Sequence, residues 1–410
     1  TDLGIILLFF CSRRPEFNQR NLWPYSKVIE FVCNLKKSIS FSTKNSSSYV
    51  SVVREAAINI RSLLASYLEI YPISLSLSGG LDSRVILASV IESKYFNNLQ
   101  IGTNESLESD FNIVKELSNQ FGFKFNSREN YLLAKNKKID RLSTYILVSC
   151  GIYDSIYCPA SIPIKNLPIP VTGHGAELFK GNYGLRSIEK VAQDCTVNQD
   201  FFREELIEGN DKLNLEIMPE LSSELHYLGY RNSLHGARVT IFSLYALRPL
   251  MNKLLVNYFN DSENIKIEER KNIINDLLIL LSPDLAKNNF DSVKKNLGQE
   301  YINSRLSLLG GEVKENECFK YKFIGEPKYE GHSISSFFLN LVKNQGYTGD
   351  MDFVSLKPMI DKVTLEVDPN YRSDIEYWAE LIKPLEGSYA SKTEKHNIAI
   401  GKLLSMHVYK

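Results

Sequence analysis

Hydrophobic positions in the first third of the chain follow two periods, one typical of helices and one typical of strands. Over residues 50–68 (VSVVREAAINIRSLLASYL), apolar side chains recur at helical spacing on one stripe, and Tyr71-Pro72 ends the pattern. The next run, ISLSL at 73–77, alternates apolar and polar residues with the period of two expected for a strand. The pattern therefore predicts an amphipathic helix followed by a buried strand.

The alternation of helix and strand patterns continues beyond a glycine-bearing loop at 78–83. The further elements predicted are helices over 84–93 and 109–122 and strands over 99–103, 123–125 and 169–173. Strands that alternate with helices at this spacing favour an α/β fold with a doubly wound, mainly parallel sheet. In such a sheet the ligand binds at the carboxyl ends of the strands.

Changes in pattern along the chain predict its organisation. A Ser-rich stretch without periodicity at 40–48 marks a linker, and beyond about Asn257 the pattern turns mostly helical. We therefore expect an N-terminal segment or remnant of a small domain at 1–48, an α/β domain at 49–290 and a mainly helical extension at 291–410.

Composition narrows the classes of partner. The 410 residues are 43% apolar, and 48 basic side chains balance 48 acidic ones, so electrostatics gives no reason to expect nucleic acid or an anionic membrane. The apolar run LGIILLFFC near the start is about half as long as a membrane span and is expected to be a buried strand.

The cysteines also exclude some chemistry. The six are scattered, without a Cys-x-x-Cys pair or a Cys/His cluster at metal spacing, which leaves zinc and thioredoxin-like chemistry without support. A reducing compartment is the simple interpretation, and we expect a cytoplasmic protein. The residues are Cys11, Cys33, Cys150, Cys158, Cys195 and Cys318.

The loop SGGLDS joins the strand at 73–77 to the helix that follows. A strand, a tight glycine turn and a helix N-terminus form an anion site, because the first amides of a helix lack intrahelical partners and the helix dipole is positive there. Gly79 and Gly80 let the backbone approach a ligand, and Ser78 and Ser83 supply hydroxyls. The loop lacks the spacing of a Walker A or a dinucleotide motif. An ordinary glycine-rich turn is the alternative.

Two charged residues refine this hypothesis. Asp82 would repel a bare phosphate, but it suits a Mg²⁺ ion that bridges the carboxylate and phosphate oxygens. Arg84, in the first turn of the helix, opposes the dipole and would be favoured by an anion nearby. The loop is thus predicted to hold a metal–phosphate group.

The SGGLDS loop after an apolar strand resembles the pyrophosphate loop of the ATP pyrophosphatase (PP-loop) superfamily, whose fold is similar to that of adenine nucleotide alpha hydrolases. Segments downstream resemble the asparagine synthetase branch, and the likeness runs roughly from Val50 to Phe290. LQIGT with SDFNIVKELSNQFG is similar to its second strand–helix unit, PVTGHGAELFKGNYG to its Ser-Gly-Glu-Gly-Ser-Asp-Glu loop, and SLYALRPLMN to its Glu-Ala-Arg-Val-Pro-Phe-Leu-Asp segment.

The resemblance implies ATP and Mg²⁺ as cofactors and assigns roles to individual positions. Leu77 and Ile101 would contact the adenine through backbone or apolar surface, and Thr172 and Gly173 would line the nucleotide. Asp82 and Glu177 would bind the metal ion, Glu177 standing where the family has a second aspartate. The residues expected to hold the pyrophosphate are Ser78, Gly79, Gly80, Asp82 and Ser83.

Several positions depart from the family pattern. His174 replaces a glutamate tied to the substrate, Asn252 an aspartate and Tyr245 a glutamate. The family's catalytic lysine is expected before the helix that ends near Pro283; Lys271 is the first candidate, with Arg270 and Lys287 as others. The candidates for catalytic roles are therefore Lys271, Tyr245, His174 and Arg84.

The resemblance implies an ATP-dependent ligase that adenylates a substrate carboxylate and transfers the acyl group to an amine or ammonia. The substrate would be a small molecule or peptide. Cys11 and Cys33 lie in apolar runs, and neither opens the chain as a glutaminase nucleophile would, so a partner glutaminase, free ammonia or an amine within the substrate remain as nitrogen donors. The last option is similar to β-lactam synthetases and lasso-peptide cyclases. A tRNA sulfur transferase of the same superfamily, a catalytically inactive ATP-binding protein and a homodimer are left open.

Overall fold

The structure is a computed structural model that describes residues 48–105, 107–127, 140–149, 168–181, 186–193, 199–200, 203–204, 207, 224, 247–260, 267–323, 336–366, 369, 372–385 and 394–408. These residues form two compact units. The first contains the described residues within 48–127 and 168–323, and the second contains those within 140–149 and 336–408.

The first unit is a mixed α/β structure, mostly helical, around a small parallel sheet with strand order β3-β2-β1-β4. A further parallel bridge joins Val171 to Leu247 beside β4. From β1 the chain continues to β2 on one side and later returns to β4 on the other, so the strand order reverses between β1 and β4. The strands are β1 (Ile73–Ser76), β2 (Leu99–Thr103), β3 (Asn126–Ser127) and β4 (Ile169–Val171).

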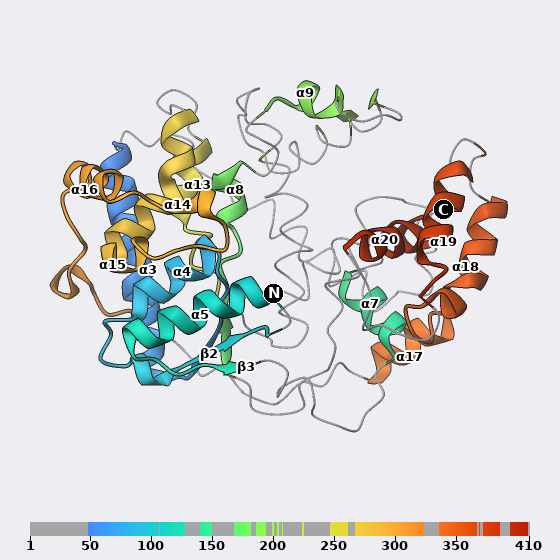
Figure 1. The fold of residues 1–410 in the computed structure, drawn as a ribbon, viewed down its shortest axis with the longest axis horizontal. Coiled ribbons are helices and arrows are strands. Elements are labelled where there is room, and N and C mark those ends of the chain that lie inside the picture. The colour runs from blue at the N-terminus through green and yellow to red at the C-terminus, as the bar shows by residue number, and fades with distance from the viewer. Residues whose placement is uncertain are drawn as a thin grey trace. The chain divides into compact units, whose positions relative to one another are not determined.

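Helices and 3-10 turns account for most of the first unit (Figure 1). They are α3 (Tyr49–Ile70), α4 (Leu81–Val90), η2 (Phe96–Asn98), α5 (Glu108–Phe121), α8 (Ala176–Lys180), α9 (Ile188–Gln193), α13 (Lys253–Asn260), α14 (Ile267–Leu281), α15 (Pro283–Ala286), η5 (Val293–Lys295), α16 (Gln299–Leu308) and η6 (Glu315–Glu317).

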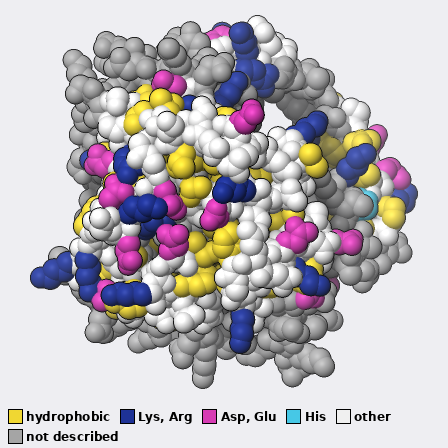
Figure 2. Space-filling view, turned by 60° about the vertical axis from the view of Figure 1, so that its left-hand side comes forward, with side chains coloured by type: hydrophobic (Ala, Val, Ile, Leu, Met, Phe, Trp, Pro, Cys, Tyr) yellow, Lys and Arg dark blue, Asp and Glu magenta, His cyan; other side chains and the backbone are white. Residues whose placement is uncertain are grey.

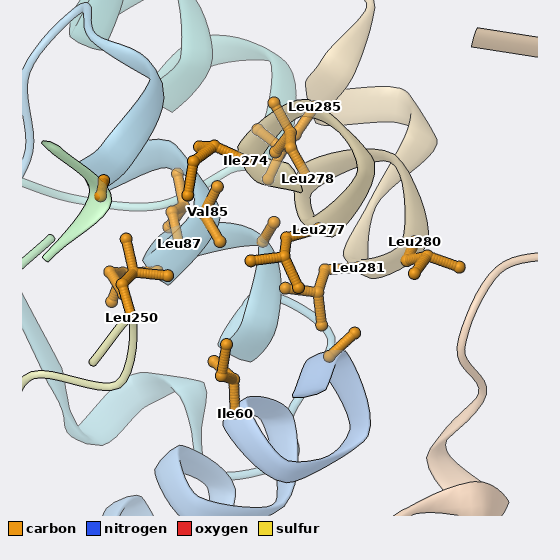
Figure 3. Close-up of a cluster of buried hydrophobic side chains, with 14 of the residues drawn as sticks. Ile60, Val85, Leu87, Leu250, Ile274, Leu277, Leu278, Leu280, Leu281 and Leu285 are labelled. Atoms are coloured by element: carbon orange, nitrogen blue, oxygen red, sulfur yellow. The ribbon is translucent and has the colours of Figure 1, made fainter. Parts of the chain in front are cut away.

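The core of the first unit is built around α14, which packs against α3, α4, α8, α15 and α16. The C-terminal half of α14 reads IINDLLILL, and its apolar side chains are all buried, as expected for a helix surrounded by other elements (Figure 3). Ile60 of α3 and Val85 and Leu87 of α4 belong to the same cluster. This packing fixes α4, and with it the loop that precedes α4.

The predicted local elements are largely confirmed. The helix at 50–68 is α3 and ends at Tyr71, the strand at 99–103 is β2, and the helix at 109–122 is α5, which Gly122 closes in the left-handed conformation with φ 70°. The strand expected at 123–125 is instead β3 at Asn126–Ser127, because these two residues pair with Gly102 and Thr103.

The first unit extends beyond the boundary expected near residue 290. Val313 donates its backbone N–H to the carbonyl of Leu280 on α14 at 2.8 Å, and the Arg61 guanidinium on α3 donates to the Val313 carbonyl at 2.6 Å. The chain up to residue 323 is therefore part of the α/β unit.

The second unit is helical and has its own buried cluster, which includes Leu142, Tyr145 and Ile360. The helix α7 lies in the stretch assigned from sequence to the α/β domain, yet it packs with the C-terminal helices: Leu142 N–H donates to the Gly349 carbonyl at 3.1 Å. The helices are α7 (Arg141–Ser149), α17 (Ser336–Asn344), α18 (Phe353–Glu366), α19 (Arg372–Ile382) and α20 (Glu394–Val408).

The described part of the chain contains no helix with both the length and the apolar character that crossing a membrane requires. On the face of the molecule in Figure 2, basic and acidic side chains are interspersed among the described residues. That view therefore gives no sign of a basic surface for nucleic acid.

Candidate functional site

Two loops meet at the carboxyl ends of β1 and β4, which are neighbours in the sheet. The first loop follows β1 and contains SGGLDS, and the second follows β4 and contains TGHG. A Cβ atom on Gly173 would lie 2.6 Å from Cβ of Asp82, so the two loops are in direct contact and only glycine fits at this position. The sequence-based prediction that both loops lie at one edge of a parallel sheet is confirmed.

The first loop is held by its own side chains. The Ser78 N–H donates to Oγ of Ser83 at 3.1 Å, and the Gly80 N–H donates to Oγ of Ser78 at 3.2 Å. Gly80 is the N-cap of α4 and makes no side-chain capping hydrogen bond. The first amides of α4 are therefore not capped by Gly80, as a site for an anion at this helix end requires.

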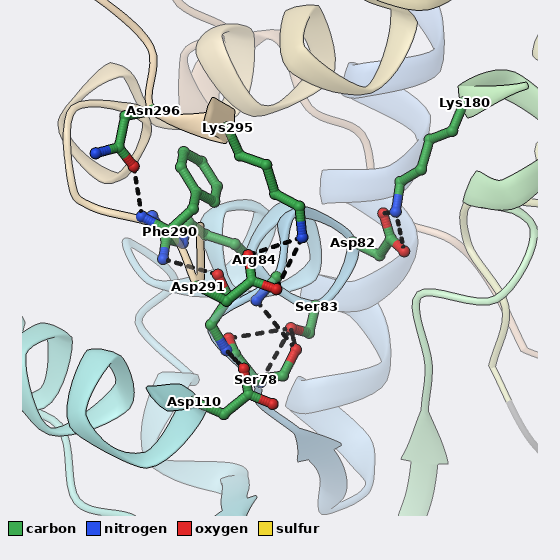
Figure 4. Close-up of polar contacts among 12 residues, drawn as sticks. Ser78, Asp82, Ser83, Arg84, Asp110, Lys180, Phe290, Asp291, Lys295 and Asn296 are labelled. Atoms are coloured by element: carbon green, nitrogen blue, oxygen red, sulfur yellow. Dashed lines mark hydrogen bonds and ion pairs between the residues drawn. The ribbon is translucent and has the colours of Figure 1, made fainter. Parts of the chain in front are cut away.

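Asp110 of α5 reaches into the first loop. Its Oδ1 accepts a hydrogen bond from the Gly79 N–H at 2.9 Å (Figure 4). A Cβ atom on Gly79 would lie 3.0 Å from this oxygen and 3.0 Å from Cβ of Asp291. A side chain at Gly79 would thus be tightly confined by the protein's own packing, and the Gly79 amide is already bound by a carboxylate.

Asp82 lies in the first turn of α4 and pairs with Lys180, the last residue of α8. The Lys180 ammonium donates to Oδ2 and also lies beside Oδ1, while Oδ1 is buried and accepts no hydrogen bond among the described residues (Figure 4). Burial raises the pKa of the Asp82 carboxyl above its usual range; Lys180 opposes this effect, and the negative charge of Glu177 adds to it. The Lys180 ammonium thus contacts both oxygens of the Asp82 carboxylate.

Glu177 lies in the first turn of α8, and its negative charge contributes to the raised pKa of Asp82. Its Oε2 accepts a hydrogen bond from the Gly175 N–H at 2.9 Å. Gly175 has φ 105°, and a Cβ atom there would lie 2.5 Å from Sδ of Met251, so this turn also requires glycine. The second loop consequently presents Glu177 from a fixed backbone.

Arg84 is fully buried, and its guanidinium binds backbone rather than facing an anion. It donates to the carbonyls of Asn288 at 2.9 Å, Asn289 at 2.6 Å and Gly79 at 3.4 Å, and it stacks on the Phe290 ring at 3.9 Å. Burial lowers its pKa to about 10, which still leaves it charged at neutral pH. These contacts give Arg84 a structural role in place of the expected contact with an anion.

The segment held by Arg84 covers the first loop. The Asp291 N–H donates to the Gly79 carbonyl at 3.1 Å, and both carboxylate oxygens of Asp291 accept from the Lys295 ammonium at 2.8 Å. The charge of Lys295 also lowers the pKa of Asp82, though burial outweighs it. Asp291 and Lys295 follow residue 290, where the domain boundary was expected, and yet they belong to the site.

Three of the expected nucleotide contacts lie in or just after the strands: Leu77 follows β1, Ile101 is in the middle of β2, and Thr172 follows β4. Leu77 and Ile101 are buried in the hydrophobic core, and the Leu77 N–H donates to the Gly102 carbonyl at 2.8 Å. Their side chains pack inside the protein, so a contact with adenine would come from their backbone. Oγ1 of Thr172 is buried and has no hydrogen-bond partner among the described residues, so it remains available to a ligand.

The remaining candidates for substrate or catalytic roles lie in different places. His174 is partly exposed in the turn between Gly173 and Gly175, at the site. Tyr245 lies outside the described residues. Oδ1 of Asn252 accepts from the Leu254 N–H at 2.9 Å, which makes Asn252 a cap of α13.

The expected lysine candidates lie on α14 and α15 or just after them. Lys271 is exposed on α14, and no hydrogen bond or ion pair joins it to either loop among the described residues. Arg270 is fully buried. Lys287 pairs with Asp284 at 2.9 Å. Among the described residues, Lys180 contacts the first loop through Asp82, and Lys295 lies beside it through Asp291.

Sequence reasoning missed Asp110, Lys180, Asp291 and Lys295. Asp110 is an acidic residue in the first turn of a helix, a position usually explained by the helix dipole alone. Lys180 lies inside the second-loop motif, and its position three residues after Glu177 was the available signal. Nothing in the local sequence joins Asp291 or Lys295 to the first loop.

Among the described residues, no group of three or more His, Cys, Asp or Glu side chains could hold a metal ion without other ligands. Asp82 and Glu177 alone can supply the one or two carboxylates that Mg²⁺ takes when phosphate oxygens and water complete its shell.

Neither a comparison with protein-family models nor a search of curated proteins finds a match to this chain.

Proposed function

We propose that the chain is an ATP-dependent amide-forming ligase that adenylates a substrate carboxylate. The observation that carries the proposal is the junction of the SGGLDS loop with the second loop at the carboxyl ends of β1 and β4. The strand order reverses between these two strands, and open α/β sheets bind ligands in the crevice at such a point. We assign the fold accordingly to the doubly wound, PP-loop type.

Pyrophosphate would bind at the start of α4. This helix end has no side-chain cap, and the hydroxyls of Ser78 and Ser83 lie beside it. The Gly79 amide can take part only if a phosphate oxygen replaces the Asp110 carboxylate. The carboxylate and the phosphate are both oxygen anions, so the Gly79 amide donates to a negatively charged oxygen before and after this exchange.

The residues present fit a Mg²⁺ ion. Among the described residues, Asp82 is paired with the flexible side chain of Lys180, which a metal ion can displace, and Glu177 lies close enough to raise the pKa of Asp82. A cation between these carboxylates would offset both the burial of one and the repulsion between them. Bound there with the nucleotide, Mg²⁺ would neutralise the negative charge of the phosphates.

The proposed reaction follows from the position of the SGGLDS segment at the start of α4. The substrate carboxylate attacks the α-phosphorus of ATP, the bond between the α-phosphorus and the bridging oxygen breaks, and pyrophosphate leaves. The uncapped amides of α4 are oriented in advance toward the charge that develops on the leaving group, so they stabilise the transition state more than the ground state. An amine or ammonia then attacks the acyl carbonyl, and AMP leaves.

The nitrogen donor stays open between ammonia, a partner glutaminase and an amine within the substrate. His174 and the segment with Asp291 and Lys295 border the site and differ in chemistry from a site for aspartate alone, which favours a substrate other than aspartate. Ring closure by an internal amine remains part of the proposal as its second form.

A nucleotide-binding protein without catalysis is the second candidate. The Lys180–Asp82 pair favours it, because the lysine neutralises the carboxylate on which the metal site depends. A sulfur transferase acting on tRNA has less support, since the face in Figure 2 mixes both signs of charge.

The test is exchange of labelled pyrophosphate into ATP by the purified chain with Mg²⁺ and a panel of carboxylates. We expect exchange that depends on one class of carboxylate, with AMP as the spent nucleotide. The variant Asp82→Asn should bind no Mg²⁺–ATP and support no exchange. ADP as the substrate-dependent product would contradict the proposal. Binding of Mg²⁺–ATP without exchange or AMP under any carboxylate would favour the inactive candidate.

A further inference from the structure

Lys180 occupies the carboxylate that is proposed for the metal ion. Its ammonium contacts both oxygens of Asp82, and it comes from the second loop through α8, whereas Asp82 belongs to α4. The contact of Gly173 with Asp82 fixes the distance between the two backbones. The pair is therefore built into the junction of the loops and is not an accidental contact of two surface side chains.

The side chains of Lys180 and Asp82 differ in conformational freedom. The Lys180 side chain is 40% exposed and that of Asp82 is 24% exposed. Asp82 is anchored in the first turn of α4, but the lysine ends in a point charge on a flexible four-carbon stem. The ammonium can therefore leave the carboxylate while both backbones stay in place.

From this geometry we propose that Lys180 is a phosphate-binding residue that holds the Asp82 carboxylate until a metal ion and nucleotide bind. With Mg²⁺ and nucleotide bound, the Asp82 carboxylate would hold the metal ion, and the released Lys180 ammonium would contact a phosphate oxygen of the nucleotide. This inference rests on the proposed function. The ligand that Lys180 would bind is a polyphosphate.

Charge balance supports the exchange. In the structure the Lys180 ammonium neutralises Asp82, and the Asp110 carboxylate accepts the hydrogen bond of the Gly79 amide. A Mg²⁺–nucleotide brings its own cation for the carboxylate and its own anion for the amides. The Lys180 ammonium must then either turn into solvent or pair with another anion. The phosphate of the bound nucleotide is the anion within its reach.

Lys180→Met separates the two halves of the exchange. Without nucleotide, the variant should bind Mn²⁺ roughly fivefold more tightly than the wild type, because a competing ion pair of this exposure contributes at most about 1 kcal/mol. The paramagnetic resonance signal of Mn²⁺ measures this binding. With nucleotide, the variant should bind Mg²⁺–ATP and Mg²⁺–pyrophosphate roughly tenfold more weakly by calorimetry, because a charge-assisted hydrogen bond is lost.

The controls keep structure apart from binding. Lys190→Met removes an exposed lysine on α9 and should change neither affinity. Lys180→Arg retains the charge and should restore most of the nucleotide affinity. In the background Asp82→Asn, Lys180→Met should no longer change Mn²⁺ binding. Circular dichroism and urea unfolding confirm that each variant is folded.

Each other outcome has a definite meaning. Wild-type binding of Mg²⁺–ATP that is unchanged in Lys180→Met would overturn the inference and leave the proposed function standing. Weaker nucleotide binding without tighter Mn²⁺ binding would also overturn it, because Lys180 would then bind phosphate without competing with the metal ion for Asp82. A wild type that binds no Mg²⁺–ATP would contradict the proposed function and the inference with it.

Discussion

Asp276 and Asp82 are both withdrawn from solvent in the first unit, but their surroundings differ. The side chain of Asp276 on α14 is fully buried, and both of its oxygens accept from rigid partners: Tyr49 donates through Oη, and Arg305 donates through Nε at 2.8 Å and through Nη2. Asp82 is 24% exposed and has only a flexible lysine beside it, with one oxygen that accepts no hydrogen bond among the described residues.

The difference indicates what each carboxylate is for. Burial and the charge of Asp276 raise the pKa of the Tyr49 hydroxyl, and the hydrogen bond to Asp276 raises the pKa of Arg305, so both partners stay protonated donors. That network joins α3, α14 and α16 and leaves Asp276 no free acceptor. Asp82 is held by one partly exposed lysine, which a ligand can displace. A carboxylate fixed by several buried donors serves the fold, and one held by a single flexible cation at a loop junction suits binding.

Removing the Asp276 carboxylate should have the largest effect on stability. Asp276→Ala leaves the Arg305 guanidinium and the Tyr49 hydroxyl without their partner, and breaking one side of such a pair costs about 3–5 kcal/mol. Urea unfolding followed by circular dichroism measures the loss. Asp284→Ala, which breaks the exposed pair with Lys287, is the matched control and should cost about 0.5 kcal/mol or less. A loss below 1 kcal/mol for Asp276→Ala would mean that Asp276 is no more structural than a surface carboxylate.

Arg84 should resemble Asp276 and not Asp82. Arg84→Met removes the donor to three backbone carbonyls at once, and we expect a loss of about 3 kcal/mol in urea unfolding. Arg84→Lys should recover little of this, because an ammonium lacks the planar fork that reaches several carbonyls. Unchanged stability with weaker nucleotide binding would show that Arg84 serves the ligand after all.

The sequence allowed the local elements to be predicted because each carries its own signals. The stripe of α3 ends at Tyr71-Pro72, and α5 ends at Gly122, whose left-handed backbone suits glycine. The position of β3 was wrong because Phe123 and Phe125 imitate strand alternation, whereas the actual pairing depends on the register of β2. A register set by a neighbouring strand is not a local property.

The site was predictable only in part, for a similar reason. The residues of SGGLDS and the second loop have local motifs, and the parallel sheet brings their backbones together. The partners that bind them come from far along the chain: Lys180 is 98 positions from Asp82, and Arg84 binds a carbonyl 204 positions away. No periodicity records such contacts, because they follow from packing around α14.

The contact between the loops can be tested by glycine substitution. Gly173→Ala introduces a methyl group 2.6 Å from Cβ of Asp82, and we expect a loss of about 1–2 kcal/mol in urea unfolding as the loops separate. Nucleotide binding should weaken as well, because the two carboxylates move apart. Gly102→Ala in β2 is the control, since the added methyl group would meet only the Asn126 carbonyl at 3.7 Å. Equal effects of both substitutions would contradict a tight junction.

The smallest expected effect is the dependence of stability on pH at Asp82. Burial raises the pKa of Asp82 in the folded chain above its value in the unfolded chain. The folded state therefore favours the protonated carboxyl, and this contribution to stability is fully present below the ordinary pKa of about 4 and is lost as pH rises through the raised value.

Asp82→Asn cannot ionise, so the free energy of unfolding of the wild type minus that of the variant should fall as pH rises from about 4 toward neutrality. The fall should be larger in a Lys180→Met background, because the lysine that opposes the shift is then absent. Urea unfolding at a series of pH values measures both differences. A difference that rises with pH would mean that Lys180 outweighs burial and that Asp82, like Asp276, is held as a satisfied ion pair.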